Sequence, residues 1–271
     1  MSAPGRKESK LNQQRLPNEA PRVLVAQPDP QGGPDRLRGW ALRHKIELDV
    51  RPGDHPDLPS NLDGYAGLIV LGGHMGDRDT AKYPWLQRLR ELFHDARSRE
   101  LPALGICLGA QLMASAFGGR VERGDLGFEA GVVMIRREEE AEFDPIFGRL
   151  PELMYSGAMH GDAITTLPKD AVLLATGEQY PHQAFRVGSC WGVQFHPEVN
   201  PAQYEKWVES LCAEDPANAE SYRESIPEFQ LLDDKIARGC AELAGNFFQL
   251  LGQHDMAKVG LPSRCRAPGP E

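Results

Sequence analysis

The stretch Gly105-Ile106-Cys107-Leu108-Gly109-Ala110-Gln111 decides the fold of this chain. The apolar run 102–106 predicts a buried strand, and residues 108–117 carry the pattern of a helix that closes at Gly118-Gly119. A G-x-C-x-G sequence at such a junction is typical of a nucleophile elbow, a turn so tight that the residues flanking the nucleophile must be small. We therefore expect the Cys107 thiol at the carboxyl edge of a sheet and at a helix N-terminus, whose dipole favours the thiolate. The alternative is that these glycines only allow a strand and a helix to pack closely.

The segments around this elbow alternate between short apolar runs and runs of helical spacing. In the first half we expect strands at 22–27, 46–51 and 65–71 and helices at 35–45 and 83–100. Such alternation predicts an α/β fold with a parallel sheet covered by helices on both faces. In the second half we expect shorter strands at 131–137, 171–176, 183–186 and 190–195, then helices over 201–212 and 230–251.

The composition of the 271 residues is that of a globular protein with one large domain. The polar, Pro-containing residues 1–21 predict a disordered tail, residues 22–252 the folded domain, and residues 253–271 a flexible C-terminal tail. A net charge of −9 argues against nucleic acid as the main partner, and no apolar run reaches the length of a membrane span.

The cysteines favour a reduced, cytoplasmic protein. Five are present at irregular spacings without a C-x-x-C pair, which predicts neither a disulfide framework nor a zinc site. Residues 1–21 also lack the apolar core of a signal peptide. We expect no metal and no cofactor.

A second signal is the segment Gln194-Phe195-His196-Pro197-Glu198 at the end of an apolar run. A cysteine nucleophile benefits from an imidazole base, and the base benefits from a carboxylate that orients it. His196 and Glu198 are two residues apart, the offset of side chains on one side of a strand, so we expect them to lie within reach of each other.

The third signal is Leu71-Gly72-Gly73-His74, where a predicted strand runs into consecutive glycines. A tight loop of this kind leaves backbone N–H groups free, and these can complete an oxyanion hole with the N–H of Leu108. An ordinary glycine turn is the alternative.

These segments, in this order, resemble the class I glutamine amidotransferases, and Met159-His160-Gly161-Asp162 is similar to the His-Gly-Asp segment of GMP-synthase-type members. The resemblance covers residues 23–199 and implies a flavodoxin-like open, mostly parallel sheet. Two positions depart from the family pattern: His74 stands where many relatives have proline, and Gly157-Ala158-Met159-His160 departs from the Ser-His pairing of GMP synthases.

The resemblance implies a role for each matched residue. Cys107 would be the nucleophile, His196 the base and Glu198 the orienting carboxylate. The N–H groups of Gly73 and Leu108 would form the oxyanion hole. The implied substrate-binding residues are Gln111, Gly72 and His160, with His160 and Asp162 shaping the pocket rather than catalysing.

The implied reaction is hydrolysis of the glutamine side-chain amide through a γ-glutamyl thioester, with release of ammonia. Because the sequence holds no P-loop and no second α/β array, we expect the ammonia to pass to a separate synthetase subunit, or else to be released to solvent. Two other hypotheses remain: a γ-glutamyl peptide hydrolase that uses the same triad, and a non-catalytic regulatory partner.

Overall fold

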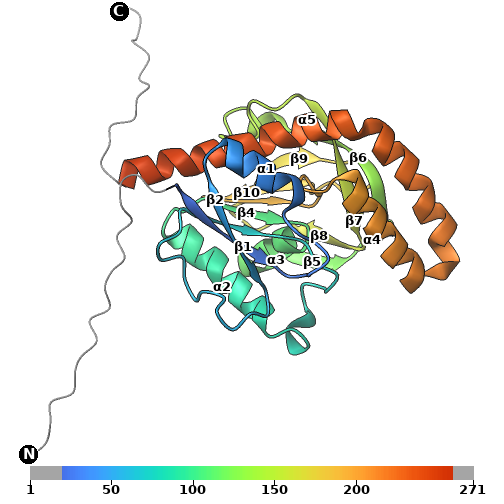
Figure 1. Ribbon diagram of the computed structural model, residues 1–271, viewed down its shortest axis with the longest axis horizontal. Coiled ribbons are helices and arrows are strands. Elements are labelled where there is room, and N and C mark those ends of the chain that lie inside the picture. Colours follow the sequence, from blue (N-terminus) through green and yellow to red (C-terminus); the bar gives the residue numbers. More distant parts are fainter. Residues whose placement is uncertain (1–19, 259–271) are drawn as a thin grey trace, which may run out of the picture.

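A nine-stranded sheet forms the centre of the computed structural model, which describes residues 20–258 (Figure 1). Its strands are β1 (Arg22–Gln27), β2 (Glu47–Pro52), β3 (Gly67–Val70), β4 (Ala103–Ile106), β6 (Glu129–Arg137), β7 (Leu153–His160), β9 (Val172–Thr176), β10 (Ala184–Val187) and β11 (Cys190–Val193). They lie in the order β2-β1-β3-β4-β11-β10-β9-β6-β7. Two further strands, β5 (Arg120–Arg123) and β8 (Asp162–Thr166), form a separate antiparallel pair.

The pairing of the strands changes from parallel to antiparallel at β11. From β2 to β11 the neighbouring strands are parallel, and from β11 through β10, β9 and β6 to β7 they are antiparallel. In the parallel half, β3, β4 and β11 are fully buried apolar runs, as is usual for parallel strands covered on both faces, whereas the edge strand β2 is partly exposed. The expectation of shorter strands in the second half is wrong for β6 and β7, which have nine and eight residues, whereas β3 and β4 of the parallel half have four each.

Helices cover both faces of the sheet. They are α1 (Asp35–Arg43), α2 (Trp85–Ser98), α3 (Leu108–Ala116), α4 (Pro201–Glu214) and α5 (Ala219–Lys258). Successive strand residues point to opposite faces, so Val23 and Val25 of β1 join the core beneath α1, α4 and α5, whereas Leu24 and Ala26 join the core beneath α2 and α3. Figure 1 shows α5 on one side of the sheet and α2 on the other. The α/β fold expected from the sequence is therefore confirmed.

The last helix differs from the prediction at both ends. It begins at Ala219 instead of residue 230, because it continues through Pro227, a residue type that usually ends or kinks a helix. It extends to Lys258, past the expected domain boundary at residue 252. The rest of the two predicted tails, residues 1–19 and 259–271, lies outside the described residues.

Strand β7 was not predicted, and its sequence explains why. Ser156 and Gly157 interrupt any apolar alternation, although both are buried. Gly157 is needed because the ring of Phe229 from α5 takes the space of a side chain: a Cβ there would lie 2.6 Å from Phe229 Cε2. The glycine in this strand is therefore required by a residue 72 positions away along the chain, which the local pattern does not reveal.

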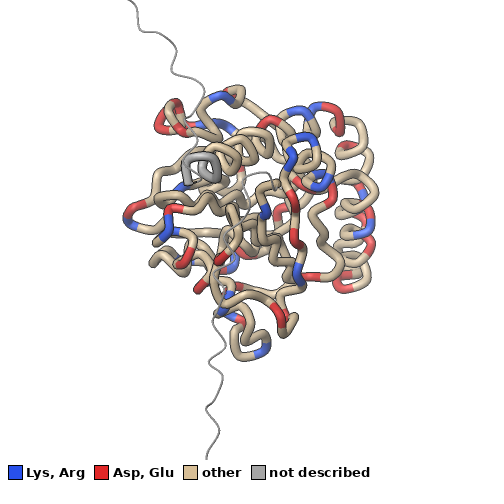
Figure 2. Tube along the Cα trace, turned by 60° about the vertical axis from the view of Figure 1, so that its left-hand side comes forward, with Lys and Arg blue, Asp and Glu red and all other residues tan. Residues whose placement is uncertain are grey.

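The surface mixes the two signs of charge. In the view of Figure 2, basic and acidic residues alternate along the helices and loops rather than separating into faces of one sign. No helix within residues 20–258 combines the length and the apolar character needed to cross a bilayer.

Candidate active site

The turn at Cys107 has the strained geometry of a nucleophile elbow. Cys107 has φ 51° and ψ −109°, a left-handed conformation that costs free energy for a residue with a side chain. A Cβ on Gly105 would lie 2.6 Å from the backbone of Gly109, and a Cβ on Gly109 would lie 2.1 Å from the carbonyl oxygen of Val70. The expectation that the flanking residues must be small is thus confirmed, and the sulfur lies at the N-terminus of α3.

Three neighbouring parallel strands bring the candidate residues together. In the register of the sheet, Val70 of β3 pairs with Gly105 of β4, and Ile106 pairs with Val193 of β11. The segments that follow these strands therefore emerge at one carboxyl edge, where open α/β sheets bind ligands. A Cβ on Gly72 would lie 2.7 Å from the His196 ring and 3.4 Å from Cys107 Cβ, so the three segments meet.

His196 and Glu198 lie side by side, as expected, but not as alternating positions of a strand. Strand β11 ends at Val193, and His196 makes a single antiparallel bridge in which its N–H donates to the carbonyl of Gly157 at 2.8 Å. The chain then turns at Pro197-Glu198, which brings Glu198 Oε1 to 2.7 Å from His196 Nδ1. The expected proximity is present, and a turn produces it.

The surroundings of His196 favour its protonated form. Burial lowers the pKa of the imidazole, but the Glu198 carboxylate and the Cys107 sulfur outweigh it and raise the pKa to about 10. A ring with this pKa stays an imidazolium at neutral pH. It can therefore act as an acid toward a leaving group.

Two backbone N–H groups stand free beside the thiol. Within residues 20–258, the N–H groups of Gly73 and Leu108 donate to no protein acceptor, and buried N–H groups rarely lack one. The two residues are neighbours, since a Cβ on Gly73 would lie 3.2 Å from Leu108 Cδ2. They suit an anion that arrives with the substrate.

The remaining predicted residues also line the cavity, but they use much of their hydrogen-bonding capacity internally. The Gln111 amide nitrogen donates to the Asp162 carbonyl at 2.9 Å and faces Gln194 Oε1 at 3.3 Å, which leaves its oxygen for a ligand. Both ring nitrogens of His160 are engaged, one with Glu129 at 2.8 Å and the other with the Asp162 carbonyl at 3.0 Å. His160 therefore suits the role of shaping the cavity better than that of binding substrate.

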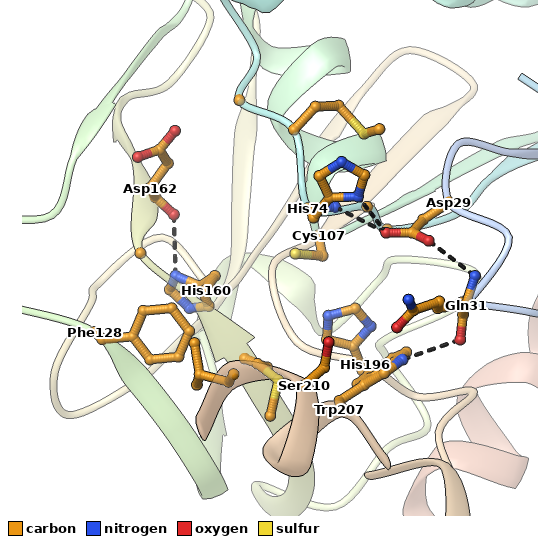
Figure 3. Close-up of a pocket in the computed structure, with 18 of the residues that line it drawn as sticks. Asp29, Gln31, His74, Cys107, Phe128, His160, Asp162, His196, Trp207 and Ser210 are labelled. Carbon is orange, nitrogen blue, oxygen red and sulfur yellow. Dashed lines mark hydrogen bonds and ion pairs between the residues drawn. The ribbon is translucent and has the colours of Figure 1, made fainter. Parts of the chain in front are cut away.

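The cavity has a volume of about 490 Å³, within the usual range for small-molecule sites. Cys107, His196 and Glu198 lie among its lining residues, and Figure 3 shows His74, Asp29 and Trp207 around the thiol and the imidazole. Its lining also includes Phe128, Leu211, Tyr222 and Arg123.

Several of these lining residues were not predicted from the sequence. Trp207 lies on a predicted helix, and Asp29 follows a predicted strand, but neither belongs to a motif. In the described part of the chain, no group of three or more His, Cys, Asp or Glu side chains is arranged to hold a metal ion.

Curated relatives of this chain are glutamine-hydrolysing enzymes. A GMP synthase (glutamine-hydrolyzing) from Porphyromonas gingivalis is 34% identical over 144 residues, which cover 52% of this chain and 26% of that protein. One subunit of a GMP synthase (glutamine-hydrolyzing) from Methanothrix thermoacetophila is 35% identical over 144 residues, which cover 52% of this chain and 72% of that relative. The match thus spans about a quarter of the first relative and most of the second.

Solved structures show the same fold. A glutamine amidotransferase from Thermotoga maritima superimposes with a TM-score of 0.75 at 26% identity, covering 85% of this chain and 99% of that one. One from Methylobacillus flagellatus gives a TM-score of 0.71 at 23% identity over 87% of this chain and 95% of that one. Residues 40–212, more than half of the sequence, match the family model for glutamine amidotransferase class-I. This chain therefore belongs to the class-I glutamine amidotransferases, a family of cysteine-dependent enzymes.

Proposed function

We propose that this enzyme hydrolyses the side-chain amide of glutamine, with Cys107, His196 and Glu198 as its catalytic triad. The observation that carries the proposal is the meeting of thiol, imidazole and carboxylate at one sheet edge, beside the free N–H groups of Gly73 and Leu108. The names of the curated relatives, both glutamine-hydrolyzing, support glutamine as the substrate.

The first step is attack by the thiolate. His196 holds the proton that Cys107 gives up, since its raised pKa of about 10 keeps the imidazolium at neutral pH. The sulfur adds to the γ-carbonyl carbon of glutamine, and the C=O electron pair moves onto the oxygen. The N–H groups of Gly73 and Leu108 then stabilise the oxyanion.

The next steps release the two products. The oxyanion collapses, the C–N bond breaks, and His196 gives its proton to the leaving nitrogen, which departs as ammonia and leaves a γ-glutamyl thioester. His196, now neutral, takes a proton from water, and the hydroxide adds to the thioester carbon. Collapse expels the thiolate and releases glutamate. Glu198 keeps the His196 ring oriented through both proton transfers.

Replacing the nucleophile tests this proposal. Cys107→Ala should abolish ammonia release from glutamine, whereas Cys190→Ala should retain it, because Cys190 is buried on β11 and does not line the cavity. Both variants are assayed alongside the wild-type enzyme, with folding checked by circular dichroism. Retained turnover in folded Cys107→Ala would rule out the triad.

The size of the cavity favours a second candidate substrate. Its volume of about 490 Å³, with Phe128, Leu211 and Tyr222 also in the lining, leaves room for a group attached to the γ-glutamyl nitrogen. A γ-glutamyl peptide would use the same steps, with an amine in place of ammonia as the leaving group. Comparing kcat/KM for glutamine and for a γ-glutamyl dipeptide separates the two, since the higher value identifies the preferred substrate.

The ammonia released from glutamine has two possible fates. One curated relative is named as a single subunit of GMP synthase, which supports delivery to a separate synthetase subunit. The other fate is release to solvent. Assaying ammonia release with the chain alone and with candidate partner proteins distinguishes them, because a partner that receives ammonia should raise glutamine turnover.

A further inference from the structure

A chain of contacts in the cavity lining joins His74, which follows Gly73, through Asp29 and Gln31 to Trp207 on α4 (Figure 3). Its centre is residues 29–32, which follow β1 at the carboxyl edge of the sheet; we call this segment the bridge. The bridge lies against both sides: a Cβ on Gly32 would be 3.6 Å from the Trp207 ring and 4.0 Å from the carbonyl oxygen of Gly72.

One end of the bridge contacts the loop that carries Gly73 and His74, which we call the oxyanion loop. Asp29 Oδ2 lies 2.6 Å from His74 Nδ1 and accepts from the backbone N–H of His74 at 3.3 Å. The other ring nitrogen, Nε2, lies 3.3 Å from the Tyr83 hydroxyl. With its proton on Nδ1, a neutral His74 donates to Asp29 and accepts from Tyr83, so both ring nitrogens are satisfied. These contacts fix the position of His74, the residue directly after Gly73.

The other end of the bridge is hydrogen-bonded to α4, the helix that carries Trp207 beside His196. The N–H of Gln31 donates to Asp29 Oδ1 at 2.8 Å, and its carbonyl accepts from Trp207 Nε1 at 3.1 Å and from Gln203 Nε2 at 2.6 Å. The Trp207 ring meets the His196 ring with centroids 4.8 Å apart and an interplanar angle of 63°. An indole in this position restrains the imidazole by contact.

We propose that Asp29 is a positioning residue. Through the bridge, it fixes the position of the oxyanion loop relative to His196. Gly73 and His196 lie on different loops, and productive geometry requires placement to within about 0.5 Å. Asp29 suits this role because its side chain is only 13% exposed and its two oxygens serve the two ends, Oδ2 toward His74 and Oδ1 toward Gln31. The inference rests on the proposed hydrolysis at Cys107.

Kinetics of two single variants and a control test the bridge. In Asp29→Ala, kcat for glutamine should fall roughly tenfold or more while KM changes less, because the oxyanion contact strengthens only in the transition state. Asp29→Asn should recover part of the loss, since its amide oxygen can still accept a hydrogen bond. Asp170→Ala, which removes an exposed ion pair with Arg97 outside the cavity, should retain wild-type kcat. A purely structural role would instead lower the amount of folded enzyme.

A double variant tests whether the two ends act together. Trp207→Phe keeps a ring beside His196 but loses the N–H that reaches Gln31. If the bridge is one unit, Asp29→Ala/Trp207→Phe should lose less kcat than the product of the single losses. Independent, multiplying losses would overturn the proposal, as would an Asp29→Ala enzyme whose kcat stays within about twofold of wild type.

A second measurement needs no γ-glutamyl substrate. The rate at which iodoacetamide alkylates Cys107 depends on the thiolate, which His196 supports. Asp29→Ala should slow this alkylation, and Asp170→Ala should not. If wild-type enzyme hydrolyses no γ-glutamyl amide, the proposed function fails while this measurement still tests the bridge. An unchanged alkylation rate in Asp29→Ala would then overturn it.

Discussion

His196 Nδ1 lies 2.7 Å from Glu198 Oε1, and the two residues are only 4% and 2% exposed. The other carboxylate oxygen, Oε2, is buried without a partner among the described residues. Glu198 Oε1 therefore makes the one hydrogen bond between this carboxylate and the His196 imidazole. Removing the carboxylate charge should lower the pKa of His196, and this change is measurable without any assay of activity.

The stability of the protein should depend on pH through this pair. His196 has a pKa of about 10 in the folded state and about 6.5 when unfolded, so the folded state binds more protons between these values. The free energy of unfolding should therefore fall as pH rises from 6.5 toward 10, by up to about 1.4 kcal/mol per pH unit from this group. Glu198→Gln removes the largest raising cause, so its slope should be flatter. Urea unfolding of both proteins at several pH values measures the difference, and parallel slopes would contradict a charged pair.

The cysteines should differ in reactivity. Burial raises the pKa values of Cys190 and Cys240 to about 12, so both thiols stay protonated at neutral pH. Cys107, beside the His196 imidazolium, should be alkylated first by iodoacetamide. Mass spectrometry of digested protein after timed exposure gives the order. Equal labelling of Cys107 and Cys190 would favour a non-catalytic protein over the proposed enzyme.

Gly72→Ala should damage catalysis more than folding. Its Cβ would lie 2.7 Å from His196 Cε1, so the imidazole must shift, and misplacement by about 1 Å can cost roughly 10²-fold in rate. The matched control is Gly252→Ala, because a Cβ there meets nothing within 4 Å and α5 gains a better helix former. We expect wild-type kcat and equal or greater stability for the control. A Gly72→Ala enzyme of normal kcat would mean that His196 need not stay where it is.

Pro227→Ala should stabilise the fold. Proline inside a helix lacks the N–H for one hydrogen bond and crowds the preceding turn, at a cost of about 3 kcal/mol relative to alanine. Pro227 is exposed within α5, so alanine fits without displacing core residues. The urea midpoint should rise. A lower midpoint would instead show that Pro227 sets the bend with which α5 passes over the sheet in Figure 1.

Local sequence by itself determined most of the helices and strands and the elbow at Cys107. The first strand runs over Arg22–Gln27 as predicted, because its apolar run is short and bounded. The elbow at Cys107 was predictable because its requirements are local: small residues at 105 and 109 and a strand-to-helix junction. The His-Pro-Glu segment was predictable for the same reason, although a turn rather than a strand brings its two side chains together.

Only the tertiary structure decided what surrounds these residues. Gly157 in β7 leaves the space that the ring of Phe229 occupies. The long-range contacts of Asp29 with His74 and of Gln31 with Trp207 depend on where separate loops and α4 lie at the edge of the sheet. No periodicity encodes such contacts, because each joins residues of separate loops, strands or helices that only the packing of the fold brings together. The sequence therefore indicated the candidate reacting groups, whereas the packing of β1, β3 and α4 determined which side chains surround them.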